Sequence, residues 1–279
     1  CSIFPDYLGT TEKTEILSGS RIKALGDSSE LKDDKDLALI KIKLSSPVNN
    51  TSWMRSDGAK SDLEDNLALE DEIKTFKSFS IFNSLLKIGG GRKLISGPII
   101  VNNKIYFLDN EYYLHAFDSE DLTKNLFTIK ISNDEQKEGF HKIGGISFGD
   151  GNLYIINGTD YVFAVNSETK ELKWSKKLAN ITISNPIYDS GKVYITTLDN
   201  KLYVLDSGNG DILWTHDGVI EDLTGLSTAS IITKDRLIIL PQTSGEIYAI
   251  DSISGNDIWK NNLVSNKSSS ASFTLHDIN

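Results

Sequence analysis

The sequence predicts an all-β protein, a β-propeller built from four-stranded antiparallel blades. Three observations lead to this prediction: apolar residues alternate with polar ones with period two, one sequence pattern recurs four times, and Asn, Asp and Gly separate the short apolar runs. A single small sheet cannot bury both of its faces, whereas sheets stacked radially bury them against each other. Helical repeats are disfavoured, because the repeating apolar positions are rich in Ile, Val and Tyr.

The beginning of the chain differs in character from the rest. Residues 1–35 mix Gly, Ser, Thr and charged residues without a sustained period, and we expect a flexible tether there. Residues 36–279 form the expected propeller, an N-terminal closing segment followed by four blade repeats. The closing segment opens with DLALIKIKL, whose alternation is typical of a half-buried strand.

The only cysteine is the first residue, Cys1. A chain with one cysteine forms no internal disulfide and no zinc site with several thiolates. Because a newly made chain begins with Met, a start at Cys1 predicts that a leader was removed. Bacterial lipoproteins begin in this way, with acyl chains on the cysteine that anchor the protein. The alternative is a free N-terminal thiol without a role.

Four copies of the repeat align on an Asp or Asn that ends an apolar strand. These anchor residues are Asp118, Asn166, Asp206 and Asp251. An aromatic ring follows each anchor by eight or nine residues, at Phe127, Trp174, Trp214 and Trp259. Two further strands precede each anchor, and the Asn, Asp and Gly residues between strands supply the positive φ that tight hairpins require.

The repeated tryptophan is interpreted as a packing residue. Three of the four Trp residues occupy one equivalent position, and an active site is not copied into every blade. We expect each of the three rings to be wedged between neighbouring blades and more than about three-quarters buried. The anchor Asp and the following Ser are expected to tie the turn through side-chain to backbone hydrogen bonds.

Composition and spacing exclude several functions. The formal net charge of −10 argues against a nucleic-acid partner, whose binding needs clustered Lys and Arg. The sequence contains no run of about 18 apolar residues, so no membrane-spanning helix is predicted. The four histidines share no metal-ligand spacing; they are His115, His141, His216 and His276. The segment KIGGGRKL lacks the residue order of a phosphate-binding loop. We therefore expect no catalytic residue, no metal and no cofactor.

The repeats and the N-terminal motifs of the sequence resemble a known family. The repeat VYxxxxxxxLYVLDxxxGxxLW is similar to the quinoprotein-type propeller repeat, known from alcohol dehydrogenases that use pyrroloquinoline quinone (PQQ). The N-terminal motifs resemble the BamB family, lipoproteins of the outer-membrane β-barrel assembly machinery. These motifs are Cys1, GSRIKAL at 19–25, NNTSWMRSDG at 49–58, NLAL at 66–69 and SGPIIVNNKIYFLD at 96–109. The resemblance implies an eight-bladed ring that is incomplete in this chain and truncated at its C-terminus; a smaller closed ring is the alternative.

The resemblance also implies a function and a partner. BamB-like proteins are scaffolds without chemistry of their own, lipid-anchored at the periplasmic face of the outer membrane, and they bind the barrel-forming subunit through loops resembling LRGxxxP and SDVDxxP. The first loop aligns with DLTGLSTAS, where Leu223 and Gly225 match, Thr224 replaces the Arg, and Ala229 replaces the Pro. The second aligns with LHDIN, where Asp277 matches and Asn279 replaces the second Asp. We expect both loops on one rim; the alternative is that they are turns without partner contact.

Two questions about function stay open from the sequence. A PQQ-dependent dehydrogenase or a small-molecule sensor is the alternative to the scaffold, although the dehydrogenases often carry a disulfide of adjacent cysteines, which this sequence lacks. The scaffold could also contact unfolded outer-membrane proteins directly, since sheet edges pair with extended chains.

Overall fold

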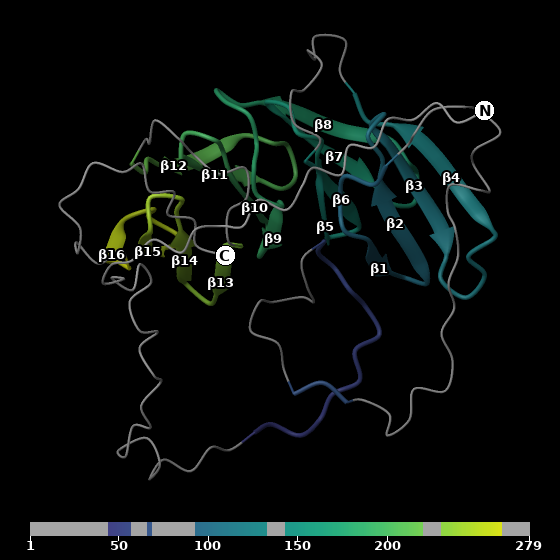
Figure 1. Ribbon diagram of the computed structural model, residues 1–279, viewed down its shortest axis with the longest axis horizontal. Helices are drawn as coiled ribbons and strands as arrows, with labels where there is room; N and C mark the ends of the chain where they lie inside the picture. Colours follow the sequence, from purple (N-terminus) through teal and green to yellow (C-terminus); the bar gives the residue numbers. More distant parts are fainter. Residues whose placement is uncertain (1–43, 57–65, 69–92, 133–142, 220–229, 264–279) are drawn as a thin grey trace, which may run out of the picture. The chain divides into compact units, whose positions relative to one another are not determined.

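A computed structural model describes residues 44–56, 66–68, 93–132, 143–219 and 230–263 of the 279-residue chain. The chain divides into two units, Cys1–Leu44 and Ser45–Asn279, and every described strand belongs to the second (Figure 1). The expected tether, residues 1–35, and its boundary with the propeller lie outside the described residues.

The described residues form sixteen strands, which make four sheets of four strands in chain order. Blade 1 consists of β1 (Ile99–Val101), β2 (Lys104–Leu108), β3 (Tyr113–Asp118) and β4 (Asn125–Lys130). Blade 2 consists of β5 (Gly145–Gly149), β6 (Asn152–Ile156), β7 (Tyr161–Asn166) and β8 (Leu172–Lys177). Blade 3 consists of β9 (Ile187–Asp189), β10 (Lys192–Thr196), β11 (Leu202–Asp206) and β12 (Ile212–His216). Blade 4 consists of β13 (Ile232–Lys234), β14 (Leu237–Pro241), β15 (Glu246–Asp251) and β16 (Asp257–Asn262).

All neighbouring strands pair antiparallel, and each blade carries a register shift at the same place. The shift lies between the third and fourth strands, for example after Ala164 in blade 2 and after Ala249 in blade 4. Such a bulge bends the strand and increases its twist. The prediction of an all-β fold of four-stranded antiparallel propeller blades is confirmed, and the described part of the propeller holds four blades.

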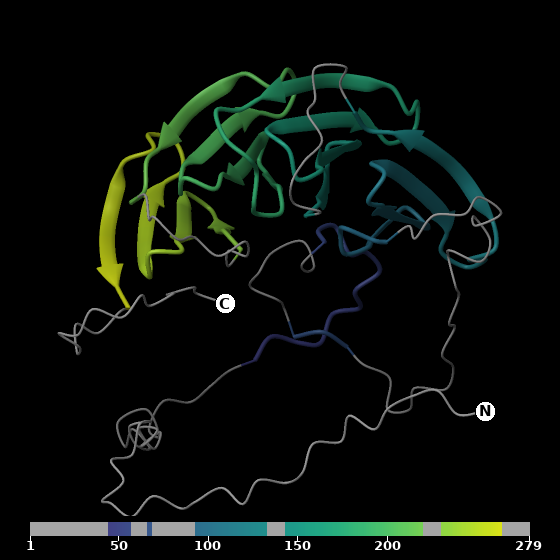
Figure 2. The ribbon, with the colours of Figure 1, turned by 45° about the horizontal axis from the view of Figure 1, so that its top comes forward.

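Three apolar clusters join consecutive blades, so each interface has its own core. Strand β7 illustrates the principle, because side chains alternate between the two faces of a strand. Val162 and Ala164 pack with residues of blade 3, whereas Phe163 and Val165 pack with residues of blade 1. Figure 2 shows the four sheets following one another in chain order, from teal to yellow. Blades 2 and 3 therefore bury both faces, which explains why their third strands, β7 and β11, are almost continuously apolar.

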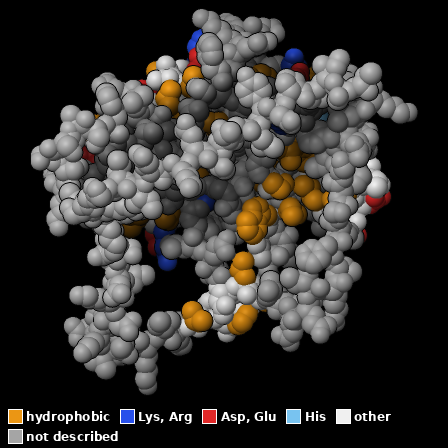
Figure 3. Space-filling model, in the orientation of Figure 1, with side chains coloured by type: hydrophobic (Ala, Val, Ile, Leu, Met, Phe, Trp, Pro, Cys, Tyr) orange, Lys and Arg blue, Asp and Glu red, His pale blue; other side chains and the backbone are white. Residues whose placement is uncertain are grey.

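The segment Trp53–Ser56 joins the first strands of blades 1 and 2. Trp53 and Ile100 exchange two backbone hydrogen bonds of 2.7 Å, and the N–H of Phe148 donates to the carbonyl of Met54 at 2.8 Å. Hydrophobic side chains of described residues gather in one area of the face seen in Figure 3. Residues 53–56 of the motif NNTSWMRSDG thus form a segment that pairs with the first strands of two blades.

The anchor residues organise the turns between third and fourth strands. The Oδ1 atom of Asp118 accepts hydrogen bonds from the backbone N–H groups of Glu120 and Asp121, at 2.9 and 3.1 Å. Asn166, Asp206 and Asp251 accept the corresponding pair of backbone N–H groups. These bonds lower the pKa of Asp118 and hold the pKa of Asp251 at about 2, with the N–H of Ser254 as the largest cause.

The low pKa of Asp251 predicts a pH dependence of stability. The folded-state pKa of about 2 lies below the usual 3.8, so the stabilisation is complete above about pH 4 and is lost as the pH falls toward 2. We expect Asp251→Asn, which keeps the accepting oxygen but cannot titrate, to lose less stability over this range. Urea unfolding of both proteins between pH 5 and pH 2 measures the difference. Equal losses in the two proteins would contradict the prediction.

The repeat Trp residues occupy equivalent places but differ in burial. Trp174 is 8% exposed, and its indole N–H donates to the carbonyl of Ser207 in blade 3 at 3.0 Å. Trp214 is partly buried against blade 4. Trp259 is 47% exposed. The expectation of burial is correct for Trp174 and wrong for Trp259, because burial comes from the next blade and no described blade follows β16.

Candidate partner-binding rim of blades 3 and 4

The five predicted partner-binding residues lie outside the described residues; they are Leu223, Thr224, Gly225, Asp277 and Asn279. The first three belong to residues 220–229, within the connection from β12 to β13. Both ends of this connection are described, at residues 217–219 and 230–231. The geometry of these ends fixes where the connection leaves and re-enters the propeller.

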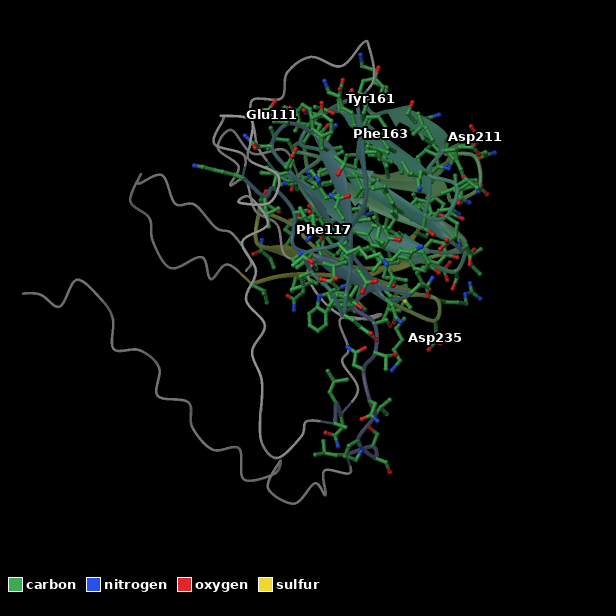
Figure 4. The ribbon with its side chains drawn as sticks, turned by 90° about the vertical axis from the view of Figure 1, so that its right-hand side faces the viewer. Glu111, Phe117, Tyr161, Phe163, Asp211 and Asp235 are labelled. Carbon is green, nitrogen blue, oxygen red and sulfur yellow. The ribbon has the colours of Figure 1, made fainter. Side chains whose placement is uncertain are left out.

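The connection from β12 to β13 leaves the propeller at the end of the blades that carries the turns between second and third strands. The turns between first and second strands, such as the one that holds Asp235, lie at the opposite end of each sheet. Figure 4 shows Glu111, in the turn from β2 to β3, far from Asp235. We name the first end the loop rim, and define it by the turns at 109–112, 157–160, 197–201 and 242–245.

Asn200 holds the start of the 220–229 connection on the loop rim. Its side-chain amide donates to the carbonyl of Val219 at 2.7 Å and to the hydroxyl of Thr243 at 2.9 Å. The hydroxyl of Thr243 donates in return to Oδ1 of Asn200 at 3.0 Å. Asn200 is 3% exposed and has a φ of 57°, which Asn tolerates better than most residues. One side chain thus connects the turn of blade 3, the turn of blade 4 and the connection between them.

Backbone groups complete this arrangement. The carbonyl of Asn200 accepts hydrogen bonds from the N–H of Gly218 at 3.0 Å and from the side-chain amide of Gln242 at 3.2 Å. A β-carbon on Gly218 would collide with the amide of Gln242 and lie 2.5 Å from the carbonyl of Asn200. Glycine is therefore needed at 218, where the chain passes close to both blades.

The surface next to this point is polar and charged, with one exposed apolar side chain. Lys201 forms an ion pair of 2.8 Å with Asp217, whose side chain is 77% exposed. The hydrogen bond to Asp217 raises the pKa of Lys201, which keeps this lysine charged. Val219 is 44% exposed directly before the 220–229 connection. This part of the loop rim offers hydrogen-bonding and apolar contacts, as protein interfaces do.

Blades 1 and 2 hold a comparable connection in the same way. The side-chain amide of Asn157 donates to the carbonyl of Ile131 at 3.0 Å, just before residues 133–142. Ile131 is 3% exposed, and its N–H donates to the carbonyl of Tyr112 at 2.7 Å. Each of these two connections thus has its start held by an asparagine of the loop rim, Asn157 in one and Asn200 in the other, although the sequences of the connections differ.

Two histidines form pairs that the sequence did not predict. His115 is 1% exposed, and its Nε2 lies 2.9 Å from Oδ2 of Asp109, which is also buried. Its Nδ1 lies 3.1 Å from the hydroxyl of Thr128. His216 pairs with Asp257 of blade 4 at 2.7 Å. No spacing could reveal the second pair, whose members are 41 residues apart and meet only because blades 3 and 4 pack together.

The described residues hold neither a cluster of metal ligands nor a membrane-spanning helix. Within them, no three His, Cys, Asp or Glu side chains gather as metal ligands. His141 and His276 lie outside the described residues. Within the same part of the chain, no helix is long and apolar enough to cross a membrane.

Comparison with known proteins decides the family. The family model described as outer membrane protein assembly factor BamB matches residues 128–279, more than half of the chain. The chain belongs to the BamB family. The matched region begins in β4 and includes blades 2 to 4 and the connection 220–229. The predicted resemblance to BamB proteins and to the quinoprotein-type repeat is confirmed.

The individual relatives are distant in sequence. An uncharacterized protein of Rickettsia prowazekii (strain Madrid E) is 27% identical over 60% of this chain and 40% of its own length. The outer membrane protein assembly factor BamB of Nitrosomonas eutropha is 22% identical over 71% of this chain and 47% of its own. The chain therefore spans less than half the length of these curated relatives.

A solved BamB structure shares the fold. The crystal structure of BamB from Moraxella catarrhalis matches with a TM-score of 0.52 at 15% identity, and the match covers 61% of this chain and 50% of that one. The match supports the assignment of the four sheets as blades of a BamB-type propeller.

Proposed function

We propose that this protein is a non-enzymatic scaffold of the outer-membrane β-barrel assembly machinery and binds the barrel-forming subunit through loops of the propeller. The observation that carries the proposal is the match of residues 128–279 to the BamB family model. Among these residues, the connection 220–229 contains Leu223, Thr224 and Gly225, the residues that align with one partner-binding loop of the family.

The geometry of the loop rim suits this role. A binding loop that is held at its base loses less conformational entropy when the partner binds. Asn200, Gly218 and Thr243 supply such a base for residues 220–229. The blades are rigid because each interface has its own apolar core, and they present the loop in a constant orientation. Asp277 and Asn279, in the second family-like loop, are part of the proposed surface.

The proposal places the protein on the periplasmic side of the outer membrane, anchored by lipid on Cys1. An anchored propeller is confined to the membrane surface, which raises its effective concentration near a membrane-embedded partner. In this arrangement the protein holds the mobile domains of the barrel-forming subunit in a productive orientation. Direct contact with unfolded outer-membrane proteins is not needed for this role.

Leu223→Asp tests the partner surface. An apolar side chain displayed on a loop contributes to binding through burial by the partner, and a carboxylate there opposes that burial. We expect affinity for the periplasmic domains of the barrel-forming subunit to fall roughly tenfold or more, with the thermal midpoint nearly unchanged. Calorimetric titration and a thermal melt measure the two quantities. Unfolding of the variant, or unchanged affinity, would contradict the proposed role of Leu223.

Asn200→Gly tests the base of the loop. Glycine removes the side-chain bonds to Val219 and Thr243 but accepts the positive φ without strain. We expect affinity for the same partner domains to fall about threefold to tenfold, because the loop must then be ordered on binding. Asn157→Ala is the control, since it removes the bond that holds the other connection; Asn157 does not have a positive φ, so alanine is the neutral replacement there, and the variant should cost about 1 to 2 kcal/mol of stability. Equal effects of both variants on affinity would argue against residues 220–229 as the contact.

A pull-down from detergent-solubilised membranes separates the scaffold from the alternative enzyme. Recovery of the barrel-forming subunit with the wild-type chain, and its loss with Leu223→Asp, supports the proposal. Quinone-dependent oxidation of alcohols by the purified protein after addition of PQQ and calcium would overturn it in favour of a dehydrogenase.

A further inference from the structure

Blade 1 differs from the other described blades at two buried positions. Three residues before the anchor it has His115, where the other blades have an aromatic residue, Phe163, Tyr203 and Tyr248. Nine residues before the anchor it has Asp109, where they have an uncharged polar residue, Asn157, Thr197 and Gln242. Burial of a charged side chain is costly, yet His115 and Asp109 are only 1% and 0% exposed. Since three blades pack without such a pair, the repeat does not explain it.

The buried pair is connected to an exposed hydroxyl. Nε2 of His115 lies 2.9 Å from Oδ2 of Asp109, and Nδ1 of the same ring lies 3.1 Å from Oγ1 of Thr128. Thr128 stands directly opposite His115 in the register of β3 and β4. Thr128 is exposed, and β4 is the edge strand of blade 1. A buried carboxylate, a buried imidazole and a hydroxyl open to solvent thus form one chain of contacts.

The bonds to Asp109 determine which nitrogen of the ring carries the hydrogen. Burial raises the pKa of the Asp109 carboxyl, but the hydrogen bonds from His115 and from the backbone N–H groups of Tyr113 and Glu111 outweigh it and hold the pKa below its usual value. An ionised carboxylate only accepts hydrogen bonds, so Nε2 of His115 donates to it. In the neutral imidazole Nδ1 is then the acceptor, and the hydroxyl of Thr128 donates to it. An imidazole held in this way removes the proton of a nucleophilic hydroxyl.

Two neighbours complete this group of residues. The ring of Phe107 stacks on the ring of His115, with 5.1 Å between the centroids and 22° between the planes, and helps to fix the orientation of the imidazole. The side-chain amide of Asn125 donates to Oγ1 of Thr128 at 3.1 Å. When Oγ1 attacks a carbonyl carbon, negative charge develops on the carbonyl oxygen, and a side-chain amide close to the nucleophile can donate to it. The group therefore holds a base, a hydroxyl nucleophile and a donor for the oxyanion.

We propose that Thr128 is a site of covalent acylation that takes an acyl group from an activated ester, with His115 as the base and Asp109 as the residue that positions it. Nδ1 of His115 removes the hydroxyl proton while Oγ1 of Thr128 forms a bond to the acyl carbon. The bond from that carbon to the leaving oxygen then breaks, and the leaving oxygen takes the proton from Nδ1. One acyl group is attached to each chain, so the step is a modification without turnover. It goes beyond the proposed scaffold function and does not depend on it.

Acetylation of the full chain by p-nitrophenyl acetate tests the proposal. Because lysine amines also react with this ester, the extent of acetylation is followed at each residue by mass spectrometry of peptides. Thr215 is the internal control, since it is exposed and has the same register position in blade 3, but stands opposite Tyr203. We expect Thr128 to be acetylated at least about tenfold faster than Thr215, the smaller end of what a positioned base contributes.

Two variants carry the residues that blade 2 has at the same positions, Phe163 and Asn157. His115→Phe removes the base, and acetylation of Thr128 should fall to the rate of Thr215. Asp109→Asn keeps an oxygen for the backbone N–H groups of the turn but presents an amide to Nε2, which moves the hydrogen of the ring to Nδ1. We expect the rate at Thr128 to fall about tenfold or more in this variant. Nitrogen-15 NMR of the histidine rings, with the His115 signals assigned by their absence from His115→Phe, should show the changed tautomer.

The outcomes that overturn the proposal are distinct. Acetylation of Thr128 no faster than that of Thr215, or an unchanged rate at Thr128 in folded His115→Phe, shows that the hydroxyl is not activated. A lost rate in Asp109→Asn with an unchanged tautomer shows that Asp109 only supports the fold and does not position the base. Thermal melts establish that each variant is folded. If His115→Phe does not fold, the comparison of Thr128 with Thr215 in the wild-type chain decides alone.

Discussion

Replacing Trp174 with alanine is expected to lower the free energy of unfolding by about 3 to 5 kcal/mol. The ring is 8% exposed, packs with residues of blades 2 and 3, and donates a hydrogen bond to Ser207. Its removal leaves a cavity at the interface of two blades and leaves that carbonyl without this donor. Urea unfolding of the wild type and the variant measures the loss.

The same substitution at equivalent places provides the controls. Trp259→Ala should cost about 1 kcal/mol or less, because nearly half of this ring is already exposed. Trp214→Ala should fall between the two, since Trp214 is partly buried. The cost thus follows burial by the next blade rather than the repeat position itself. Equal losses for Trp174→Ala and Trp259→Ala would contradict this explanation.

The repeat explains why the fold could be predicted from the sequence. Strand alternation, the anchor residues and the aromatic ring eight or nine residues later recur four times, and each recurrence reports the same local structure. The anchor turns have a local cause, because Asp118 and its equivalents bond to N–H groups only two and three residues away. Local bonds of this kind can be predicted from neighbouring residues alone.

Burial of the tryptophans could not be predicted in the same way. Equivalent sequence positions have equivalent local structure, but Trp174 and Trp259 differ in what lies beyond their own blade. Gly210, in the anchor turn of blade 3, lies directly against the ring of Trp174 in blade 2, and this contact between repeats becomes visible only when two blades are placed together. A trace of it was present in the sequence: Phe127 stands where the later repeats have Trp, and Lys170, whose ammonium group lies over the Phe127 ring, stands where they have Gly.

The candidate site was less accessible to sequence reasoning than the fold. The resemblance to BamB proteins indicated Leu223 and its neighbours but not the base that supports them. Asn200 reads as an ordinary turn residue in the sequence, and its bonds to Val219 and Thr243 cross from one blade to the next. The general lesson is that residues that hold a loop in place are found from contacts between repeats.

Substitution of Gly210 by alanine is expected to destabilise the protein by about 2 to 4 kcal/mol. Two costs combine at this position. Alanine is strained at a φ of 77°, and its β-carbon would be 2.6 Å from the ring of Trp174. Gly151→Ala is the matched control, because Gly151 has a φ of 74° but nothing within 4 Å of the added carbon. It should cost only about 1 kcal/mol, the strain alone.

A double-mutant cycle isolates the contact between ring and turn. In a protein that already carries Trp174→Ala, the added carbon of Gly210→Ala no longer meets the indole ring, so its cost should fall to that of Gly151→Ala. The coupling energy is then about 1 to 3 kcal/mol, obtained from urea unfolding of the four proteins. A coupling near zero would show that φ strain alone makes Gly210 necessary, and that the tryptophan does not require glycine on the blade that covers it.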